Sequence, residues 1–401
     1  MTRLTDTIGK GLNRPWLITA LDITFLAVAI SSLVYAVVTA PRNGIDFLNY
    51  YQGAREWVEG SYSNEGGTLS TYPPFFVPIL SPLALLSFER ARIIWLGLNL
   101  LAAGVSIYLV LCYFTDWPGK AKYYLALLVV SWAPFRVTLR VGQISLIIAA
   151  LLLGTLLARS RKRKYLAGIL LGISMCKFTL SFPFFLYFLW KKEWKMLITA
   201  TSLLLILTQV YALRLGVSVA EVIRGYAAVL GQLSVSRDIA YIGSTEIKPL
   251  LVWLTRGDDV WANTLFVMLF LASLIVMALV FTRRPEAEPI HFAILSLFAL
   301  WAVYHRTYDC VLYILPVALL IDLLIRKRHV TFSIFWLLAT GLLIVSLPGL
   351  LTSRLGISEE SLAQSISGFA ALHIERVLTF GMFMSFLFVL WKEDSPNPRP
   401  R

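Results

Sequence analysis

Long apolar stretches alternate with short polar or basic segments along the whole chain. Examples are Trp16–Ala40, Ile93–Phe114, Val260–Phe281 and Ala371–Trp391, each long enough for a helix that crosses a hydrocarbon core of roughly 30 Å. Lipid cannot hydrogen-bond to backbone groups, so segments that cross it must satisfy those groups internally. The pattern predicts an all-α integral membrane protein.

The basic segments between these apolar stretches predict how the protein is oriented in the membrane. Clusters of Lys and Arg occur at Arg159–Lys164, Lys191–Lys195, Arg283–Arg284 and Arg326–Arg328. Translocation disfavours such clusters, which places them, with both termini, in the cytoplasm. Tyr165–Trp190 joins two of these clusters and must therefore go in and return, as a short helical hairpin bent near Lys177–Pro183. We expect a bundle of about twelve transmembrane helices.

Three segments fall on the external side under this assignment: residues 41–90, 216–257 and 350–367. The first carries an amphipathic part and the run Tyr72–Pro78, whose three prolines argue against a regular span, so we expect juxtamembrane helices there. No repeat is visible, and we predict one polytopic membrane domain over residues 1–391. Residues 392–401 are expected to form a disordered cytoplasmic tail.

Composition supports the membrane assignment and excludes several kinds of chemistry. Of 401 residues, 58% are hydrophobic and 15% charged, and the net charge of +13 comes largely from the short basic loops rather than from a nucleic-acid surface. The three cysteines lack metal-like spacing. There is no phosphate-binding GxxxxGK loop, HExxH pair or GxSxG elbow. We expect no cofactor, no metal ion and no nucleic-acid partner.

Ionisable groups near the external surface are the best candidates for function, because charge at that depth is costly. Asp46 follows the first span by a few residues; a helix N-cap is an equally good interpretation of it. Arg136 and Arg140 lie one helical turn apart, before Gly142 and Gln143, where they could hold a phosphate or anchor the protein to lipid headgroups.

Two further cationic positions lie in apolar surroundings. Lys177 is expected at the turn of the short hairpin, where it either snorkels or meets an anionic ligand. His305 and Arg306 belong to the segment Tyr304–Asp309 between two spans, which an ordinary polar turn would also explain. One carboxylate among several cations suits a phosphate leaving group, with the acid as general base on an acceptor hydroxyl.

At these residues the chain resembles glycosyltransferase family 87, the polyprenyl-phosphate-dependent membrane transferases of the GT-C fold. The resemblance is spread over most of the chain, and the order of its parts is more specific than any one of them. Its parts are Asp46-Phe-x-x-Tyr-Tyr51, Gly60-Ser-Tyr62, Tyr72-Pro-Pro74, Arg140-x-Gly-Gln143, Gly168 through Lys177 to Pro183, and His305-Arg-x-Tyr-Asp309 before Pro316. The segment Gly243–Pro249 departs from the family pattern, so that loop indicates nothing about the acceptor.

The resemblance implies a GT-C-like bundle and an inverting transfer of a hexose, commonly mannose, from a polyprenyl-phosphate carrier to a lipid or glycan acceptor. It implies that Asp46 is the catalytic base and His305 a second active-site residue, at the external face of the plasma membrane. We further expect Arg136, Arg140, Lys177 and Arg306 to bind the phosphate of the lipid-linked sugar, and Tyr50, Tyr72, Gln143 and Asp309 to contact substrate.

A multi-span transporter or lipid flippase is the main alternative function. Such a protein would place charges near the bilayer midplane and show two related halves, and neither feature is evident in the sequence. A purely structural membrane scaffold would not require buried cations.

Overall fold

The computed structural model describes residues 15–60, 72–113, 117–235, 244–345 and 366–392. Within these ranges the chain is helical, and the only β-type pairing is a single antiparallel bridge between Ser244 and Arg306. The all-α prediction is therefore confirmed. Almost all of the outer loop predicted at 350–367, and the tail after Lys392, lie outside the described residues.

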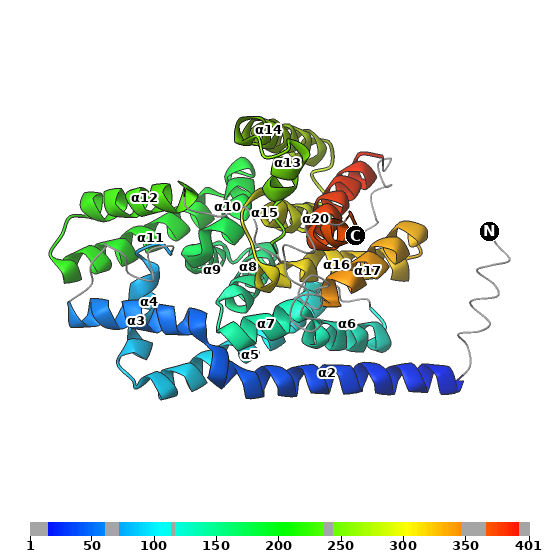
Figure 1. Cartoon of the computed structure of the whole chain (residues 1–401), viewed down its shortest axis with the longest axis horizontal. Helices are drawn as coiled ribbons and strands as arrows, with labels where there is room; N and C mark the ends of the chain where they lie inside the picture. The colour runs from blue at the N-terminus through cyan, green and yellow to red at the C-terminus, as the bar shows by residue number, and fades with distance from the viewer. Residues whose placement is uncertain (1–14, 61–71, 114–116, 236–243, 346–365, 393–401) are drawn as a thin grey trace.

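The helices follow one another in this order: α2 (Pro15–Asn43), α3 (Ile45–Glu59), α4 (Phe76–Ala84), α5 (Phe88–Tyr113), α6 (Gly119–Ser131), α7 (Ala133–Val141), α8 (Ser145–Ser160), α9 (Lys164–Ser174), η1 (Met175–Lys177), α10 (Phe178–Trp190), α11 (Trp194–Leu215), α12 (Val219–Val235), α13 (Lys248–Leu254), α14 (Asp259–Arg283), α15 (Glu288–Ala302), η2 (Thr307–Tyr313), α16 (Ile314–Ile325), α17 (Val330–Val345) and α20 (Ile366–Lys392). In Figure 1, α2 lies along one edge of the bundle and α14 near the opposite edge, with α7, α8, α15 and α16 between them.

Seven of the described helical segments are long and apolar enough to cross a membrane by length and composition, and α6 with α7, bent by 46°, makes an eighth if the pair is one span. One of the seven is Lys164–Trp190, which contains α9 and α10 and is bent back on itself, as described below. The predicted count of about twelve crossings is not confirmed. The helices α8 and α15 have 16 and 15 residues and so span only about 22–24 Å, less than the roughly 30 Å of a hydrocarbon core. The sequence estimate counted crossings by parity between basic clusters and did not distinguish short helices from full spans.

The predicted hairpin is present at α9 and α10. The segment Lys164–Trp190 has 27 residues and would be about 40 Å long if straight. Instead its two ends meet, because Glu193, just after α10, accepts ion pairs from both Lys164 and Arg159 at 2.9 Å. The chain turns at Lys177, whose φ of −115° and ψ of 77° are not helical. The tip of the hairpin is thus held in the interior of the bundle.

Ion pairs fix one end of the helices that surround this hairpin. Arg159 at the end of α8 binds both Glu193 and Glu288, the first residue of α15, at 2.9 Å. The other ends of α8 and α15, near Ser145 and Ala302, therefore point away from this basic face. They end beside the hairpin tip, about 20 Å from the ion pairs along the helix axes.

The short helix α3 directly follows α2 and lies against α4. Its buried face consists of Phe47, Tyr50, Gly53, Ala54 and Trp57, a helical spacing, while its other face is polar. It ends at Gly60 with a left-handed φ of 76°. Helices are present between residues 41 and 90, as expected, and their place at the membrane surface stays a prediction.

Candidate active site

A cavity of about 340 Å³ lies at the end of the bundle remote from the basic ion pairs. Its walls come from distant parts of the chain: the first turns of α3, the segment before α4, the link between α7 and α8, the tip of the hairpin, α12, and the segment before η2. The lining residues are Asp46, Asn49, Tyr50, Tyr72, Pro73, Gln143, Cys176, Lys177, Phe178, Thr179, Tyr226, Tyr304, His305, Arg306, Tyr308 and Asp309.

Asp46 is the acidic group on the α3 side of this cavity. It lies in the first turn of α3, partly buried, and its Oδ2 accepts a hydrogen bond of 3.2 Å from Gln143 Nε2. Burial raises the pKa of Asp46 above its ordinary value of 3.8, although the positive charges of Lys177 and Arg306 act in the opposite direction. The carboxyl is therefore close enough to both cations to feel their charge, yet is a better proton acceptor than an exposed aspartate.

A buried network forms the opposite wall of the cavity around Asp309, which is 2% exposed. Its Oδ1 binds Lys177 Nζ at 2.5 Å and accepts the hydroxyl of Ser145 at 2.6 Å, while Oδ2 lies 2.9 Å from His305 Nδ1. Ser145 also accepts a hydrogen bond from Lys177 at 3.0 Å. One carboxylate thus holds a lysine from the hairpin tip and a histidine from the segment before η2.

The geometry at Asp309 determines which atoms of its partners remain for a ligand. The ammonium of Lys177 has three N–H groups. Two are bound to Asp309 and Ser145, and the ring of Tyr308 lies 4.7 Å from the nitrogen, so Lys177 contributes mainly positive charge. The Nε2 atom of His305 is buried and has no hydrogen-bond partner among the described residues.

Arg306 and two tyrosines provide further polar groups in the lining of the cavity. Arg306 is exposed, and its Nε donates to Tyr304 OH at 2.6 Å. Burial raises the pKa of Tyr226, on α12, to about 12, so its hydroxyl stays neutral at physiological pH and can donate a hydrogen bond. Among the described residues, no three His, Cys, Asp or Glu side chains lie close enough to share a metal ion.

The structure therefore brings most of the sequence-predicted residues to one cavity. These are Asp46, Tyr50, Tyr72, Gln143, Lys177, His305, Arg306 and Asp309. Asp309 was expected to contact substrate, but both of its carboxylate oxygens are bound by other residues of the protein.

Arg136 and Arg140 do not line this cavity. They share one face of α7, as their spacing predicts, but Arg136 donates to Ser32 of α2 at 3.2 Å and to the carbonyl of Ser131. The opposite face of α7, with Thr138 and Leu139, is the buried one. Spacing predicted a shared face but could not show which neighbour that face meets.

Sequence reasoning missed Ser145, Tyr308, Tyr226 and Asn49. Ser145 follows Gln143 by two residues and Tyr308 precedes Asp309, so both were within reach of the motifs already noted. Nothing in the sequence linked Tyr226 to this site, because it reaches the cavity from α12, in an outer segment far from any motif.

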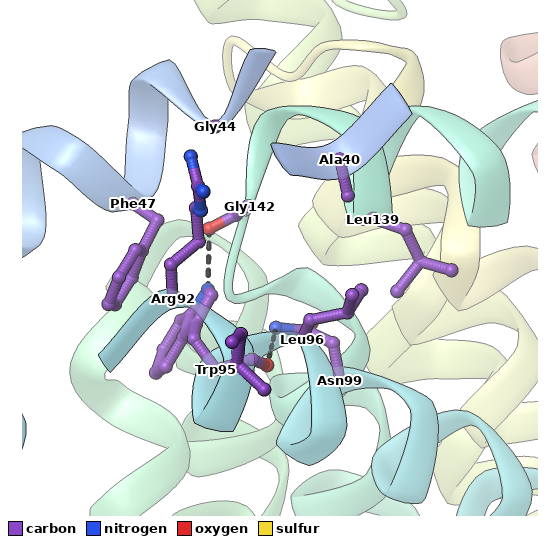
Figure 2. A pocket seen from close by; sticks show the side chains of 10 residues that line it. Ala40, Gly44, Phe47, Arg92, Trp95, Leu96, Asn99, Leu139 and Gly142 are labelled. Carbon is purple, nitrogen blue, oxygen red and sulfur yellow. Dashed lines mark hydrogen bonds between the residues drawn. The ribbon is translucent and has the colours of Figure 1, made fainter. Parts of the chain in front are cut away.

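A second, smaller cavity of about 150 Å³ lies behind the start of α3 and is mainly apolar, lined by Phe47, Trp95, Leu96 and Leu139 among others. Figure 2 shows Trp95 donating to the carbonyl of Gly142, a bond of 2.7 Å, and Asn99 donating back to the carbonyl of Trp95. Two of its lining residues, Phe47 and Gly142, are the direct chain neighbours of Asp46 and Gln143. The smaller cavity therefore lies next to the larger one.

Comparison with known proteins decides between the alternatives that the sequence left open. The model of glycosyltransferase family 87 matches residues 71–305, more than half of the chain. The chain belongs to glycosyltransferase family 87. A membrane glycosyltransferase, rather than a transporter or a scaffold, is therefore the function class of this family member.

One curated relative is the polyprenol-phosphate-mannose-dependent alpha-(1-2)-phosphatidylinositol mannoside mannosyltransferase of Mycobacterium tuberculosis (strain ATCC 25618 / H37Rv). It is 26% identical over 182 residues, which are 39% of this chain and 42% of the relative. The aligned part thus spans less than half the length of that relative. No solved structure matches the chain. The family match includes Tyr72, Gln143, Lys177 and His305, whereas Asp46 precedes it.

Proposed function

We propose that this family 87 glycosyltransferase transfers mannose from a polyprenyl-phosphate carrier to a hydroxyl of a lipid or glycan acceptor, at the external face of the membrane and with inversion. The activity given in the name of the mycobacterial relative supports the choice of carrier and sugar. The observation that carries the mechanism is the position of Asp46, across one cavity from Lys177, His305 and Arg306.

In this mechanism Asp46 takes the proton of the acceptor hydroxyl. The hydroxyl oxygen forms a bond to the anomeric carbon as the bond from that carbon to the phosphate oxygen breaks, so the polyprenyl phosphate leaves with the electron pair. Attack from the face opposite the phosphate inverts the anomeric centre. The proton goes to Asp46 and then to solvent, and no further reactant is required.

Arg306, His305 and Lys177 offset the negative charge that develops on the leaving phosphate. Arg306 is exposed at the cavity and provides a fixed positive charge with several N–H donors, which suits phosphate oxygens. His305, oriented by Asp309 through Nδ1, adds a donor and a positive charge at Nε2 when its ring carries both protons; no described residue binds that nitrogen. Lys177 acts mainly through its positive charge at the floor of the cavity, since two of its three N–H groups are bound to Ser145 and Asp309.

The depth of the cavity is consistent with a lipid-linked substrate. Its floor lies about 20 Å from the basic face, so with a core of roughly 30 Å it would be below the opposite interface. A carrier whose tail stays in the bilayer brings its phosphate to headgroup level, directly above such a floor. The basic ion pairs on the other face agree with an external active site.

The decisive experiment compares Asp46→Asn with Glu59→Gln in purified protein supplied with polyprenyl-phosphate mannose and membrane lipid acceptors. Both substitutions replace a carboxylate by an amide on α3, but Glu59 is half exposed and pairs with Arg55 at the far end of the helix. We expect Asp46→Asn to slow transfer by about 10²–10⁴-fold, the usual contribution of a general base, and Glu59→Gln to leave it unchanged. Near-normal turnover by Asp46→Asn would remove this residue as the base.

The same assay tests the choice of sugar and the stereochemistry. A panel of polyprenyl-phosphate hexoses should give product only, or most rapidly, with mannose, and the anomeric configuration of the product should be opposite to that of the carrier-linked sugar. Faster transfer of another hexose would correct the sugar without affecting the role of Asp46. Retention of configuration would contradict the single displacement.

A further inference from the structure

The side chain of Gln143 is almost fully buried, 3% exposed, between the catalytic face of α3 and the start of α8. Its Oε1 accepts three hydrogen bonds: one from Tyr72 OH at 2.8 Å, one from the backbone N–H of Ile144 at 2.9 Å, and one from Tyr50 OH. The two tyrosine hydroxyls also lie 2.6 Å from each other. The nitrogen of the same amide donates to Asp46 Oδ2 at 3.2 Å.

These partners fix the orientation of the amide. The backbone N–H of Ile144 can only donate, so the atom that faces it must be the oxygen of Gln143 and not the nitrogen. A rotated amide would turn its N–H groups towards the N–H of Ile144 and its oxygen towards the carboxylate of Asp46, losing both of these hydrogen bonds and creating a repulsion at each. The side chain therefore presents a hydrogen-bond donor to Asp46 in the only arrangement that satisfies its neighbours.

The backbone on both sides of this contact is fixed as well. Gly142 ends α7 with φ of +72°, a conformation that side chains other than glycine rarely adopt, and a Cβ there would lie 2.6 Å from Cβ of Phe47. The carbonyl of Gly142 is held by Trp95, as Figure 2 shows. The residue before Gln143 and the residue after Asp46 thus pack directly against each other.

We propose that Gln143 is a positioning residue for Asp46. Its amide binds Oδ2 of Asp46 and leaves Oδ1 of that carboxylate as the atom that takes the proton from the acceptor hydroxyl. This inference rests on the proposed role of Asp46 as base. The bond from Gln143 is the only hydrogen bond that the described residues make to that carboxylate. The same bond lowers the pKa of Asp46, against the larger effect of burial.

The test is the pH dependence of transfer in Gln143→Glu and Gln143→Met. The introduced glutamate would retain an acceptor for both tyrosines and place a second carboxyl against Asp46, so the two would share a proton and one pKa would rise strongly. We expect the acidic limb of kcat/KM to move up by about one pH unit or more, with kcat at neutral pH down about 10-fold or more and an unchanged KM for the polyprenyl-phosphate sugar. Gln143→Met, which removes the bond without adding charge, should move the limb in the same direction by less.

Two controls separate this role from others. Gln52→Glu makes the same change on an exposed part of α3 and should alter neither the limb nor kcat. Tyr72→Phe removes one of three donors to Oε1 and should have a smaller effect than Gln143→Met, since Ile144 and Tyr50 still orient the amide.

The outcomes distinguish the two hypotheses. If Gln143→Glu shows the displaced acidic limb and lowered kcat, yet binds the polyprenyl-phosphate sugar with wild-type Kd and melts at the wild-type temperature, the inference is supported, because only the base has been perturbed. A raised KM with an unmoved limb would make Gln143 a substrate contact instead, and a wild-type profile would assign it no role. A wild-type enzyme that transfers from no polyprenyl-phosphate sugar would refute the proposed function itself.

Discussion

The buried ion pair between Lys177 and Asp309 makes a quantitative prediction about stability. Asp309 binds Lys177, His305 and Ser145 at once, and the side chains of the ion pair are 9% and 3% exposed. Asp309→Asn keeps the size and shape of the side chain but removes its charge. It leaves Lys177 buried without its ion-pair partner.

The magnitude follows from the bonds that change. Bonds to charged groups contribute about 1.5–3 kcal/mol each, and Asp309 makes three of them, to Lys177, His305 and Ser145. Asparagine retains weaker versions and no longer has to desolvate a charge, which offsets part of the loss. Because breaking a buried pair costs about 3–5 kcal/mol, we expect Asp309→Asn to lower the free energy of unfolding by about 3 kcal/mol.

A double-mutant cycle isolates the contribution of the pair. Lys177→Met should cost less than Asp309→Asn, because Asp309 then still has His305 and Ser145 as partners. The double variant contains neither buried charge, so its loss should be smaller than the sum of the single losses by about 1.5 kcal/mol or more.

Unfolding by sodium dodecyl sulfate in mixed micelles, followed by circular dichroism, measures all four proteins of this cycle. Losses that add to within about 0.5 kcal/mol would refute the reasoning, because independent sites behave in that way. A single loss below about 1 kcal/mol would show that the network around Asp309 is solvated rather than buried.

Two further predictions concern Asp46 in the first turn of α3 and Gly142, which packs against that turn. Burial raises the pKa of Asp46 above 3.8, so folding disfavours its charged form and this destabilisation is present above the raised pKa and absent below 3.8. Asp46→Asn should therefore melt at or above the wild-type temperature at pH 7, with the difference vanishing below pH 3.8; a lower melting temperature at pH 7 would contradict the sign. Gly142→Ala forces a side chain into a left-handed conformation and against Phe47, so we expect the free energy of unfolding to fall by about 2 kcal/mol or more and transfer to be slower. A wild-type melting temperature and kcat would show that α3 can move away without cost.

Hydropathy and charge predicted the class of fold and its least obvious element. The four apolar stretches named as examples correspond to α2, α5, α14 and α20, because a full-length span needs about 20 apolar residues and leaves a clear signal. The hairpin followed from a different argument, that a single crossing cannot connect two basic clusters. The number of membrane crossings could not be predicted from the helices of intermediate length, because an apolar run of about 15 residues has the same sequence pattern in a short crossing and in a core helix.

The site was predictable where chemistry and position along the chain coincide. Asp46, Lys177 and His305 are ionisable groups in apolar or interfacial surroundings, and that cost alone marked them. Arg136 satisfied the same criterion but meets Ser32 of α2, because the direction in which a face of α7 points is decided by packing. Ser145 carries no charge, so no sequence argument distinguished it from the many other serines of the chain.

Helix length links the fold to the proposed chemistry. If α8, α15 and the hairpin had full membrane length, their polar ends would lie at the external surface and a lipid-linked phosphate would meet them in water. Because they end about 20 Å from the basic face, Lys177 and Asp309 sit in a recess with low dielectric, where each charge acts more strongly on a neighbouring phosphate. At the same depth an unpaired charge would be costly, so Asp309 is required as the partner of Lys177 and His305.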